Sequence, residues 1–319
     1  MVPTEFEATE TAKQLLSYFQ VVPAYLQNAD RVAKHADTRI LRHLMPRDRK
    51  RAYNVLDIIR TLADEGSFLE TGAGWGESLV TGFLRIDNQP LALIASSVIS
   101  PLGGAIDAAS SRKATRLIDI ITRTKAMHLL VLCDTPGFMV GPRAEKEGGL
   151  RAFAEWFAAA RSFEMGGGRI FGVTLRKAYG LGAQALLGGS TLSNFFGVSW
   201  PTGEFAGMGI EGESALCSAR YLKSGFHTRT RTLSGAVRLG MRKELEAVPE
   251  GQERDEFFQA LVDEMYDRGK ALNAASVFEI DTVIDPAETR RWIKQGMASV
   301  PARVPTWTQG TSKDNSAKL

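Results

Sequence analysis

The middle of the chain alternates short, continuous apolar runs with amphipathic segments, and this alternation constrains the fold more than any other feature. The apolar runs have the length and composition of buried strands, and they are LVTGFLRID, QPLALIASS, MHLLVLCD, RIFGVTLR and NFFGVSWP. The segments between the last four runs are RKATRLIDIITRTKA, LRAFAEWFAAARSFEM and GLGAQALLGGS, which have helical spacing or a glycine-rich turn into a helix. Strand–loop–helix units that repeat in this way predict an α/β core.

Turn-forming residues indicate where several of these elements begin and end. Asp87-Asn88 separates the first two runs and is typical of a tight hairpin. The segment VLDIIRTLADEGSF is predicted to be a helix that ends at Gly66. The triplet Gly166-Gly167-Gly168 is predicted to stop the helix before it.

Three segments are expected along the chain. Residues 1–52 are predicted to form a helical N-terminal extension or linker, residues 53–300 the α/β domain, and residues 301–319 a disordered tail. The extension contains a basic stretch, residues 31–51, whose only acidic residues are Asp37 and Asp48. This stretch is either an anion-binding or docking surface or a solvated face, and the lack of interleaved aromatic residues favours the solvated face.

The composition is that of an ordinary globular protein in a reducing compartment. The 319 residues are 44% hydrophobic and 24% charged, which excludes a disordered or fibrous chain. A net charge of +3 gives no overall field for nucleic acid, and two cysteines cannot form a disulfide framework. The acidic N-terminus lacks the apolar segment of a signal peptide, and no uncharged run reaches the roughly 18 residues of a membrane span. We therefore expect a cytoplasmic protein that binds neither nucleic acid nor membrane.

Two glycine-containing loops are the strongest candidates for chemistry. PGF at 136–138 and YGLGAQA at 179–185 stand where a strand leads into a helix, so their N–H groups can point at a developing oxyanion, although such turns can also be simple geometry. Residues 180–185 also match the loose dinucleotide pattern G-x-G-x-x-A, but no strand ending in an acidic residue follows. Residues 134–137, DTPG, are similar to the metal-side motif of GTPases, but the chain has no G-x-x-x-x-G-K-[ST] loop.

Other catalytic motifs are missing from the sequence. There is no H-E-x-x-H motif, no cysteine pair at zinc spacing and no G-x-S-x-G elbow, so no metal site is predicted. None of the four histidines has an obvious acid–base partner in sequence. Cys133 lies in a strand-type run and is expected to be a small buried hydrophobic residue.

Six segments, taken in their order and spacing, resemble the carboxyltransferase (beta) subunit of biotin-dependent acyl-CoA carboxylases, of the propionyl-CoA and methylcrotonyl-CoA type. They are YNVLDIIRTLADEGSFLE, GAIDAASSRKATRLIDI, LLVLCDTPGFMVG, VTLRKAYGLGAQAL, WPTGEFAGMGIEG and IDTVIDPAETRR. The resemblance is to the C-terminal domain and implies a crotonase/ClpP-like spiral of ββα units over residues 53–300. LLSYF at 15–19 is similar to the segment that ends the N-terminal domain in that family.

The resemblance implies an enzyme that moves CO2 from carboxybiotin to the α carbon of an acyl-CoA. In the family the N-terminal domain binds most of the acyl-CoA, the C-terminal domain receives carboxybiotin, and the active site lies between domains of two protomers. The implied partners are a carboxyltransferase N-domain, a biotin carboxylase and a biotin carboxyl carrier protein, in an oligomer. Phe195, Phe196, Trp200 and Met208 are expected near the face that another domain covers.

Carried over residue by residue, the resemblance assigns the catalytic N–H groups to Leu181 and Gly182. They would stabilise the enolate-like oxygen of the biotin ureido group as CO2 departs, and liberated biotin would then remove the α-proton, so that no side-chain base is required. Gly182 is expected to face a cavity, in a turn whose backbone angle favours glycine. The other residues that the resemblance implies for the biotin pocket are Gly137, Phe138, Tyr179, Gly180, Ala183, Gln184, Gly207, Met208 and Gly209.

Two alternatives to this function stay open from sequence. A decarboxylase component would run the transfer backwards from an acyl-CoA acid, and a non-catalytic half would only scaffold a carboxylase complex. The scaffold alternative rests on LRAFAEWF after Gly149, where the family has a basic residue followed by His-Gly or Asp-Gly. Gln184 stands where propionyl-type enzymes carry an acidic residue, so the resemblance does not specify the acyl group. A free-standing crotonase-type hydratase or hydrolase would need a pair of side-chain acids that the sequence lacks.

Overall fold

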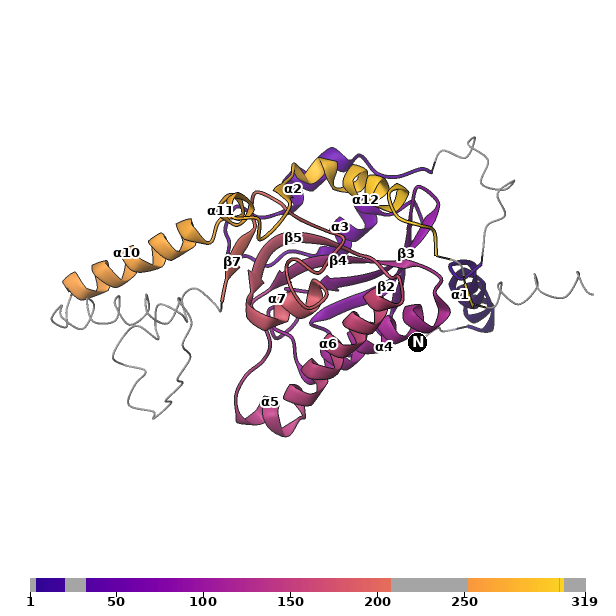
Figure 1. Ribbon diagram of the computed structural model, residues 1–319, viewed down its shortest axis with the longest axis horizontal. Helices are drawn as coiled ribbons and strands as arrows, with labels where there is room; N and C mark the ends of the chain where they lie inside the picture. Colours follow the sequence, from indigo (N-terminus) through magenta and orange to yellow (C-terminus); the bar gives the residue numbers. More distant parts are fainter. Residues whose placement is uncertain (1–3, 21–32, 208–251, 304, 307–319) are drawn as a thin grey trace, which may run out of the picture.

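The computed structural model describes residues 4–20, 33–207, 252–303, 305 and 306. In this part of the chain one sheet has the strand order β1-β2-β3-β4-β5-β6-β8, and β7 pairs with β5 beside that path (Figure 1). The first three strands pair antiparallel and the others parallel. The strands are β1 (Leu69–Thr71), β2 (Leu79–Ile86), β3 (Gln89–Ser96), β4 (His128–Thr135), β5 (Ile170–Tyr179), β6 (Phe196–Ser199), β7 (Glu204–Ala206) and β8 (Thr282–Val283).

Helices cover both faces of this sheet (Figure 1). The helices α4 and α6 pack on one face together with α7, and α2, α3 and α12 lie on the other. Helix α10 extends away from the sheet. The helices are α1 (Glu5–Ser17), α2 (Leu41–Leu44), α3 (Val55–Leu62), α4 (Ala108–Thr124), α5 (Pro142–Lys146), α6 (Gly149–Met165), α7 (Gly180–Leu186), α10 (Gln252–Arg268), α11 (Ala271–Ser276) and α12 (Thr289–Ala298), with short 3-10 turns η2 (Thr38–Ile40) and η4 (Pro286–Glu288).

The strand β4 shows why its sequence is apolar without alternation. Leu129, Val131 and Cys133 belong to the core between the sheet and the α4/α6 layer. Leu130 and Leu132 belong to the core between the sheet and α3. Successive side chains of a strand point to opposite faces, so a parallel strand with helices on both sides needs apolar residues at every position.

The β2–β3 hairpin forms where the sequence predicts it. Asp87 and Asn88 have φ of 55° and 66°, and two consecutive positive φ angles match the right-handed twist of the flanking strands. The carboxylate of Asp64 accepts hydrogen bonds from both backbone N–H groups, at 2.9 Å and 2.7 Å. The turn is thus fixed by its own conformation and by a residue from the end of α3.

Two expectations about helix ends have different outcomes. Gly166 caps α6 and Gly167 has φ of 78°, so the predicted stop is confirmed. The helix α3 ends at Leu62 and not at Gly66, because the backbone becomes extended at Ala63. There the N–H of Asp64 donates to the carbonyl of Arg85 at the end of β2.

The expected apolar face is wrong for two of its residues. Phe196 is 6% exposed and Trp200 fully buried, with the Trp200 indole N–H donating to the Thr289 hydroxyl at 2.9 Å. Phe195 is 42% exposed, and Met208 lies outside the described residues. Phe196 and Trp200 fill the core beneath α12, so these two residues cannot form a surface for another domain.

Both flanking segments contact the α/β core. Tyr18 after α1 stacks on Phe83 with ring centroids 5.6 Å apart. The guanidinium of Arg303 lies 4.9 Å from the ring of Phe163 on α6. The boundaries near residues 52 and 300 stay predictions. No helix in the described residues is long and apolar enough to span a membrane, and none of their acidic, histidine and cysteine side chains form a metal-binding cluster.

Candidate active site at the carboxyl edge of the sheet

Three loops meet where parallel strands β4, β5 and β7 end. A Cβ on Gly182, in the first turn of α7, would lie 2.7 Å from the carbonyl carbon of Gly137 after β4. A Cβ on Gly180 would lie 2.9 Å from the carbonyl oxygen of Gly207 after β7. The structure therefore brings together the backbones of Gly137, Gly180, Gly182 and Gly207. At Gly180 and Gly182 the neighbouring backbone is so close that a Cβ atom would clash with it.

This arrangement corrects the expectation for Gly182. Its Cα faces the Gly137–Phe138 backbone and not a cavity, and its φ is not positive. The positive angles belong to Gly180 at 58° and Gly137 at 117°. Because protein backbone already fills the side of Gly182, a pyrophosphate could not approach there, which removes the dinucleotide-binding alternative.

The loop 136–138 is held in place by the segment that precedes α4. The N–H of Ile106 donates to the carbonyl of Gly137 at 2.9 Å, and the N–H of Met139 donates back to Ile106 at 2.8 Å. The ring of Phe138 stacks on Phe153 of α6 with centroids 3.9 Å apart. Phe138 therefore presents its backbone, and not its ring, to α7.

The N–H groups of Leu181 and Gly182 lie in the first turn of α7. Backbone N–H groups in the first turn of a helix have no carbonyl acceptor within that helix, because no turn precedes them. The N-cap residue of α7, Tyr179, makes no side-chain capping hydrogen bond. Gly182 and Ala183 are buried, whereas Leu181 is 62% exposed and Gln184 is exposed three residues later. One side of α7 thus packs on the 136–138 loop while the other is accessible.

Tyr179 and Glu204 connect the start of α7 to β7. The Tyr179 ring is buried and its hydroxyl donates to Glu204 Oε2 at 2.7 Å. Met208 and Gly209, the remaining predicted pocket residues, lie outside the described residues.

A buried polar network of Tyr53, Asp134 and Arg176 lies beside this edge and was not predicted from the sequence. Asp134 Oδ2 accepts from the Tyr53 hydroxyl at 2.8 Å and from Arg176 Nε at 3.0 Å. Its Oδ1 accepts from the backbone N–H of Lys177 at 3.1 Å. Burial and the nearby charge of Asp134 raise the pKa of Tyr53 well above its usual value, so this side chain is a permanent donor.

The network excludes the GTPase alternative and fixes the end of β4. Asp134 is fully buried with both oxygens engaged, so it cannot hold a metal ion beside a nucleotide. A signal was present in the sequence, since Asp134 and Arg176 each end an apolar strand-type run. Opposite charges at the ends of neighbouring buried strands predict such a pair.

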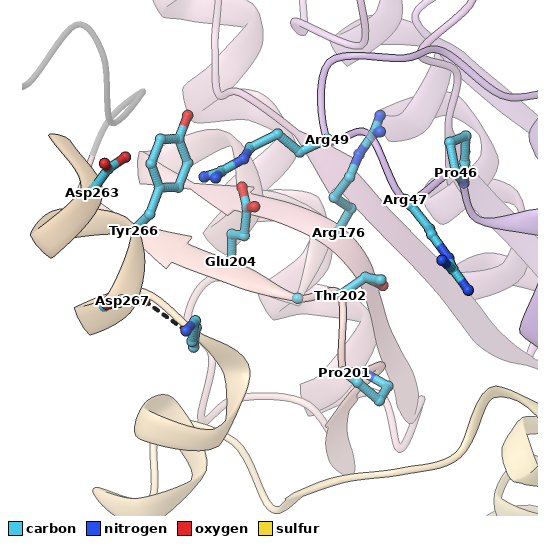
Figure 2. A pocket seen from close by; sticks show the side chains of 12 residues that line it. Pro46, Arg47, Arg49, Arg176, Pro201, Thr202, Glu204, Asp263, Tyr266 and Asp267 are labelled. Carbon is cyan, nitrogen blue, oxygen red and sulfur yellow. Dashed lines mark ion pairs between the residues drawn. The ribbon is translucent and has the colours of Figure 1, made fainter. Parts of the chain in front are cut away.

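A cleft of about 380 Å³ adjoins β7 (Figure 2). Arg176 of the buried network and Glu204, the partner of Tyr179, both line it. Arg47 and Arg49 of the N-terminal basic stretch line it as well. Its full lining is Pro46, Arg47, Arg49, Arg176, Pro201, Thr202, Gly203, Glu204, Asp263, Tyr266, Asp267 and Lys270.

One family model matches nearly the whole chain. The profile described as carboxyl transferase domain matches residues 1–303. The chain is 28% identical over 269 residues to the biotin-dependent long chain acyl-coenzyme A carboxylase beta4 subunit of Mycobacterium tuberculosis, covering 84% of this chain and 45% of that protein. It is 30% identical over 261 residues to the methylmalonyl-CoA carboxyltransferase 12S subunit of Propionibacterium freudenreichii, covering 81% and 43%. The chain thus spans less than half the length of these relatives.

Solved structures agree with this result. A single-chain, multi-domain long-chain acyl-CoA carboxylase matches with a TM-score of 0.70 and 37% identity, over 91% of this chain and 25% of that chain. The transcarboxylase 12S hexamer with methylmalonyl-CoA and methylmalonic acid bound matches with a TM-score of 0.72 and 27% identity, over 94% and 52%. The expected crotonase-like α/β fold is confirmed.

Proposed function

The chain is a member of the carboxyl transferase domain family, and from this membership we propose that it is the carboxyltransferase component of a biotin-dependent acyl-CoA carboxylase. The proposed reaction moves CO2 from carboxybiotin to the α carbon of an acyl-CoA. The observation that supports it is the packing of the first turn of α7 on the 136–138 loop, which holds two N–H groups at the carboxyl edge of the sheet. Named relatives act on long-chain acyl-CoA and on methylmalonyl-CoA, so the acyl group stays open.

The residues present fit a ureido group at this edge. Bound carboxybiotin would supply the transferable carboxyl group and, after its loss, an acceptor for the α-proton. The N–H groups of Leu181 and Gly182 are suited to donate hydrogen bonds to an oxygen that becomes negative, because donors fixed by a folded backbone need no reorganisation during reaction. The Gly137–Phe138 backbone holds α7 in position, and the stacking of Phe138 on Phe153 ties this loop to α6. Tyr179, Gly180, Ala183, Gln184, Gly207, Met208 and Gly209 complete the proposed pocket.

The proposed partners follow from the same membership. They are a carboxyltransferase N-domain that binds most of the acyl-CoA, a biotin carboxylase and a biotin carboxyl carrier protein. The hexameric assembly named for the transcarboxylase 12S structure supports an oligomer. The exposed side of α7, with Leu181 and Gln184, is available for the partner domain to approach.

Replacing Leu181 by proline tests the proposed donor. Gly180 has positive φ, so Leu181 stands at the first position with helical backbone, where proline removes an N–H that serves no helical bond. Leu181→Pro should lower carboxyl transfer by about 10²–10³-fold, the usual loss for one oxyanion donor. Leu181→Ala, which keeps the N–H and removes the side chain, is the matched control and should retain most of the activity.

The assay is carboxylation of acyl-CoA by each variant co-expressed with its partner half, alongside thermal melting. Full activity in a folded Leu181→Pro protein would show that this N–H is not a donor in the reaction. An assembly that only releases CO2 from an acyl-CoA acid in the presence of free biotin would support the decarboxylase alternative. An intact assembly in which this chain is dispensable for transfer would support the scaffold.

A further inference from the structure

The basic stretch of residues 31–51 contains arginines with and without a charged partner. Arg39 pairs with Asp37 at 2.7 Å and Arg42 with Asp285 at 2.6 Å, as in an ordinary solvated surface. Arg47 has no ion pair or side-chain hydrogen bond with any residue that the structure describes. Arg49 likewise has no ion pair within the described part of the chain, and its guanidinium carbon lies 3.8 Å from the centre of the Tyr266 ring.

The two unpaired arginines line the cleft beside β7 (Figure 2). Figure 2 shows Arg49 reaching toward Tyr266 of α10, with Arg176 between Arg49 and Arg47 in this view. The volume of about 380 Å³ lies within the range of roughly 300–1,000 Å³ that is typical of small-molecule sites. The loop after η2 and α2, the turn before β7 and the end of α10 therefore enclose a space of ligand size.

The carboxylates of this cleft already have donors. Glu204 accepts from the Tyr179 hydroxyl at 2.7 Å, and Asp263 accepts from Gln259 Nε2 at 3.1 Å. Asp267 pairs with Lys270 at 2.6 Å. The charge of the third arginine, Arg176, is likewise matched by Asp134. Among the residues that the structure describes, Arg47 and Arg49 are therefore the lining arginines whose guanidinium groups have no carboxylate partner.

We propose that this cleft binds a small-molecule oxyanion, a carboxylate or a phosphate group, through the guanidinium groups of Arg47 and Arg49. A guanidinium presents planar N–H pairs that match both anions, and a ligand rich in acceptors is what unmatched donors require. The Tyr266 ring holds the Arg49 guanidinium in place before the ligand arrives, which lowers the entropic cost of binding. The site is separate from the N–H groups of Leu181 and Gly182.

Isothermal titration of the full chain with sodium phosphate, and separately with sodium malonate, tests the proposal. Chloride keeps the ionic strength constant, and no partner or carboxyl transfer is needed, so failure here leaves the proposed function untouched. We expect saturable binding, and the anion that binds more tightly identifies the group as phosphate or carboxylate. Arg47→Gln and Arg49→Gln should each weaken binding about tenfold, the loss expected for one charge-assisted contact.

Two further variants separate specific recognition from overall charge. Arg39→Gln removes the same charge from the same basic stretch outside the cleft and should bind as the wild type does. Arg47→Lys keeps the charge but loses the planar pair of donors and should bind more weakly than the wild type. Thermal melting reports whether each variant is folded. Absence of saturable binding of either anion, or equal weakening by Arg39→Gln, would overturn the proposal.

Discussion

At the scale of single residues, the fold changes the pKa of His128 in a way that can be tested. Its Nδ1 accepts a hydrogen bond from the N–H of Arg169 at 3.2 Å, and its Nε2 lies 3.3 Å from the carbonyl of Pro301. Both contacts are satisfied only by the neutral ring with its proton on Nε2. Burial lowers the pKa of His128 from 6.5 to about 4.

This pKa predicts a loss of stability in mild acid. Between pH 6.5 and about 4 the unfolded chain binds a proton at His128 and the folded chain does not, so the free energy of unfolding falls as the pH falls. The full loss across this window is about 3 kcal/mol, from 1.36 kcal/mol per unit of pKa. Urea denaturation at a series of pH values should show a shallower dependence in His128→Asn, whose side-chain oxygen can still accept from Arg169. Parallel curves for the two proteins would contradict the assignment.

Cys133 illustrates how burial removes reactivity. Its side chain is fully buried in the core of β4, and burial raises the pKa of its thiol well above the usual value. In a Cys217→Ser background, where Cys133 is the only thiol, a disulfide reagent should not label the native protein and should label it fully in denaturant. Labelling of native protein at the rate of a free cysteine would show that β4 opens readily.

At the scale of elements, Asp64 and Arg290 join three parts of the fold. Arg290 of α12 donates to the Asp64 carboxylate at 2.5 Å and also to the carbonyl of Leu62 at the end of α3. The same carboxylate caps the turn between β2 and β3. Both side chains are only 9% exposed, so loss of one partner leaves the other buried without compensation.

Arg290→Met should therefore lower the free energy of unfolding by about 3–5 kcal/mol. Arg291→Met is the matched control on the same helix, because Arg291 is 65% exposed and pairs with Glu288 at the surface. Such an exposed pair contributes roughly 0–1 kcal/mol. Chemical denaturation of both variants measures the difference, and equal losses would mean that the buried pair does not couple α12 to the hairpin.

At the scale of the whole molecule, the faces of the sheet are packed and its carboxyl edge holds the candidate site. Helices bury both faces of the sheet, while the loops after β4, β5 and β7 meet at its carboxyl edge, where the structure places α7. The chain spans less than half of its named relatives. In the proposed function this edge meets carboxybiotin, and the acyl-CoA is held mainly by a partner domain.

Residues 1–319 by themselves should accordingly bind acyl-CoA weakly. Calorimetric titration with propionyl-CoA and a long-chain acyl-CoA should give dissociation constants well above the micromolar range, and addition of the partner half should tighten them. Light scattering should show that the chain associates at micromolar concentration. A low micromolar constant, about −8 kcal/mol, for the chain without partner would contradict the proposed division of the substrate.

The sequence by itself determined most of the helices and strands of this protein. The patterns that predict them depend only on neighbouring residues: the periodicity of strands and helices, the dipeptides of hairpin turns and the glycines that end helices. The β2–β3 hairpin at Asp87-Asn88 and the continuous apolar run of β4 could therefore be predicted, and so could the family from the order of its motifs. The tertiary structure alone decided what those elements touch. Gly182 meets Gly137 and not a cavity, and Trp200 enters the core, because packing chooses between inside and outside. The pairing of Asp134 with Arg176 and the cleft beside β7 both bring together residues that lie far apart in the sequence. No local sequence pattern contains the distances between them.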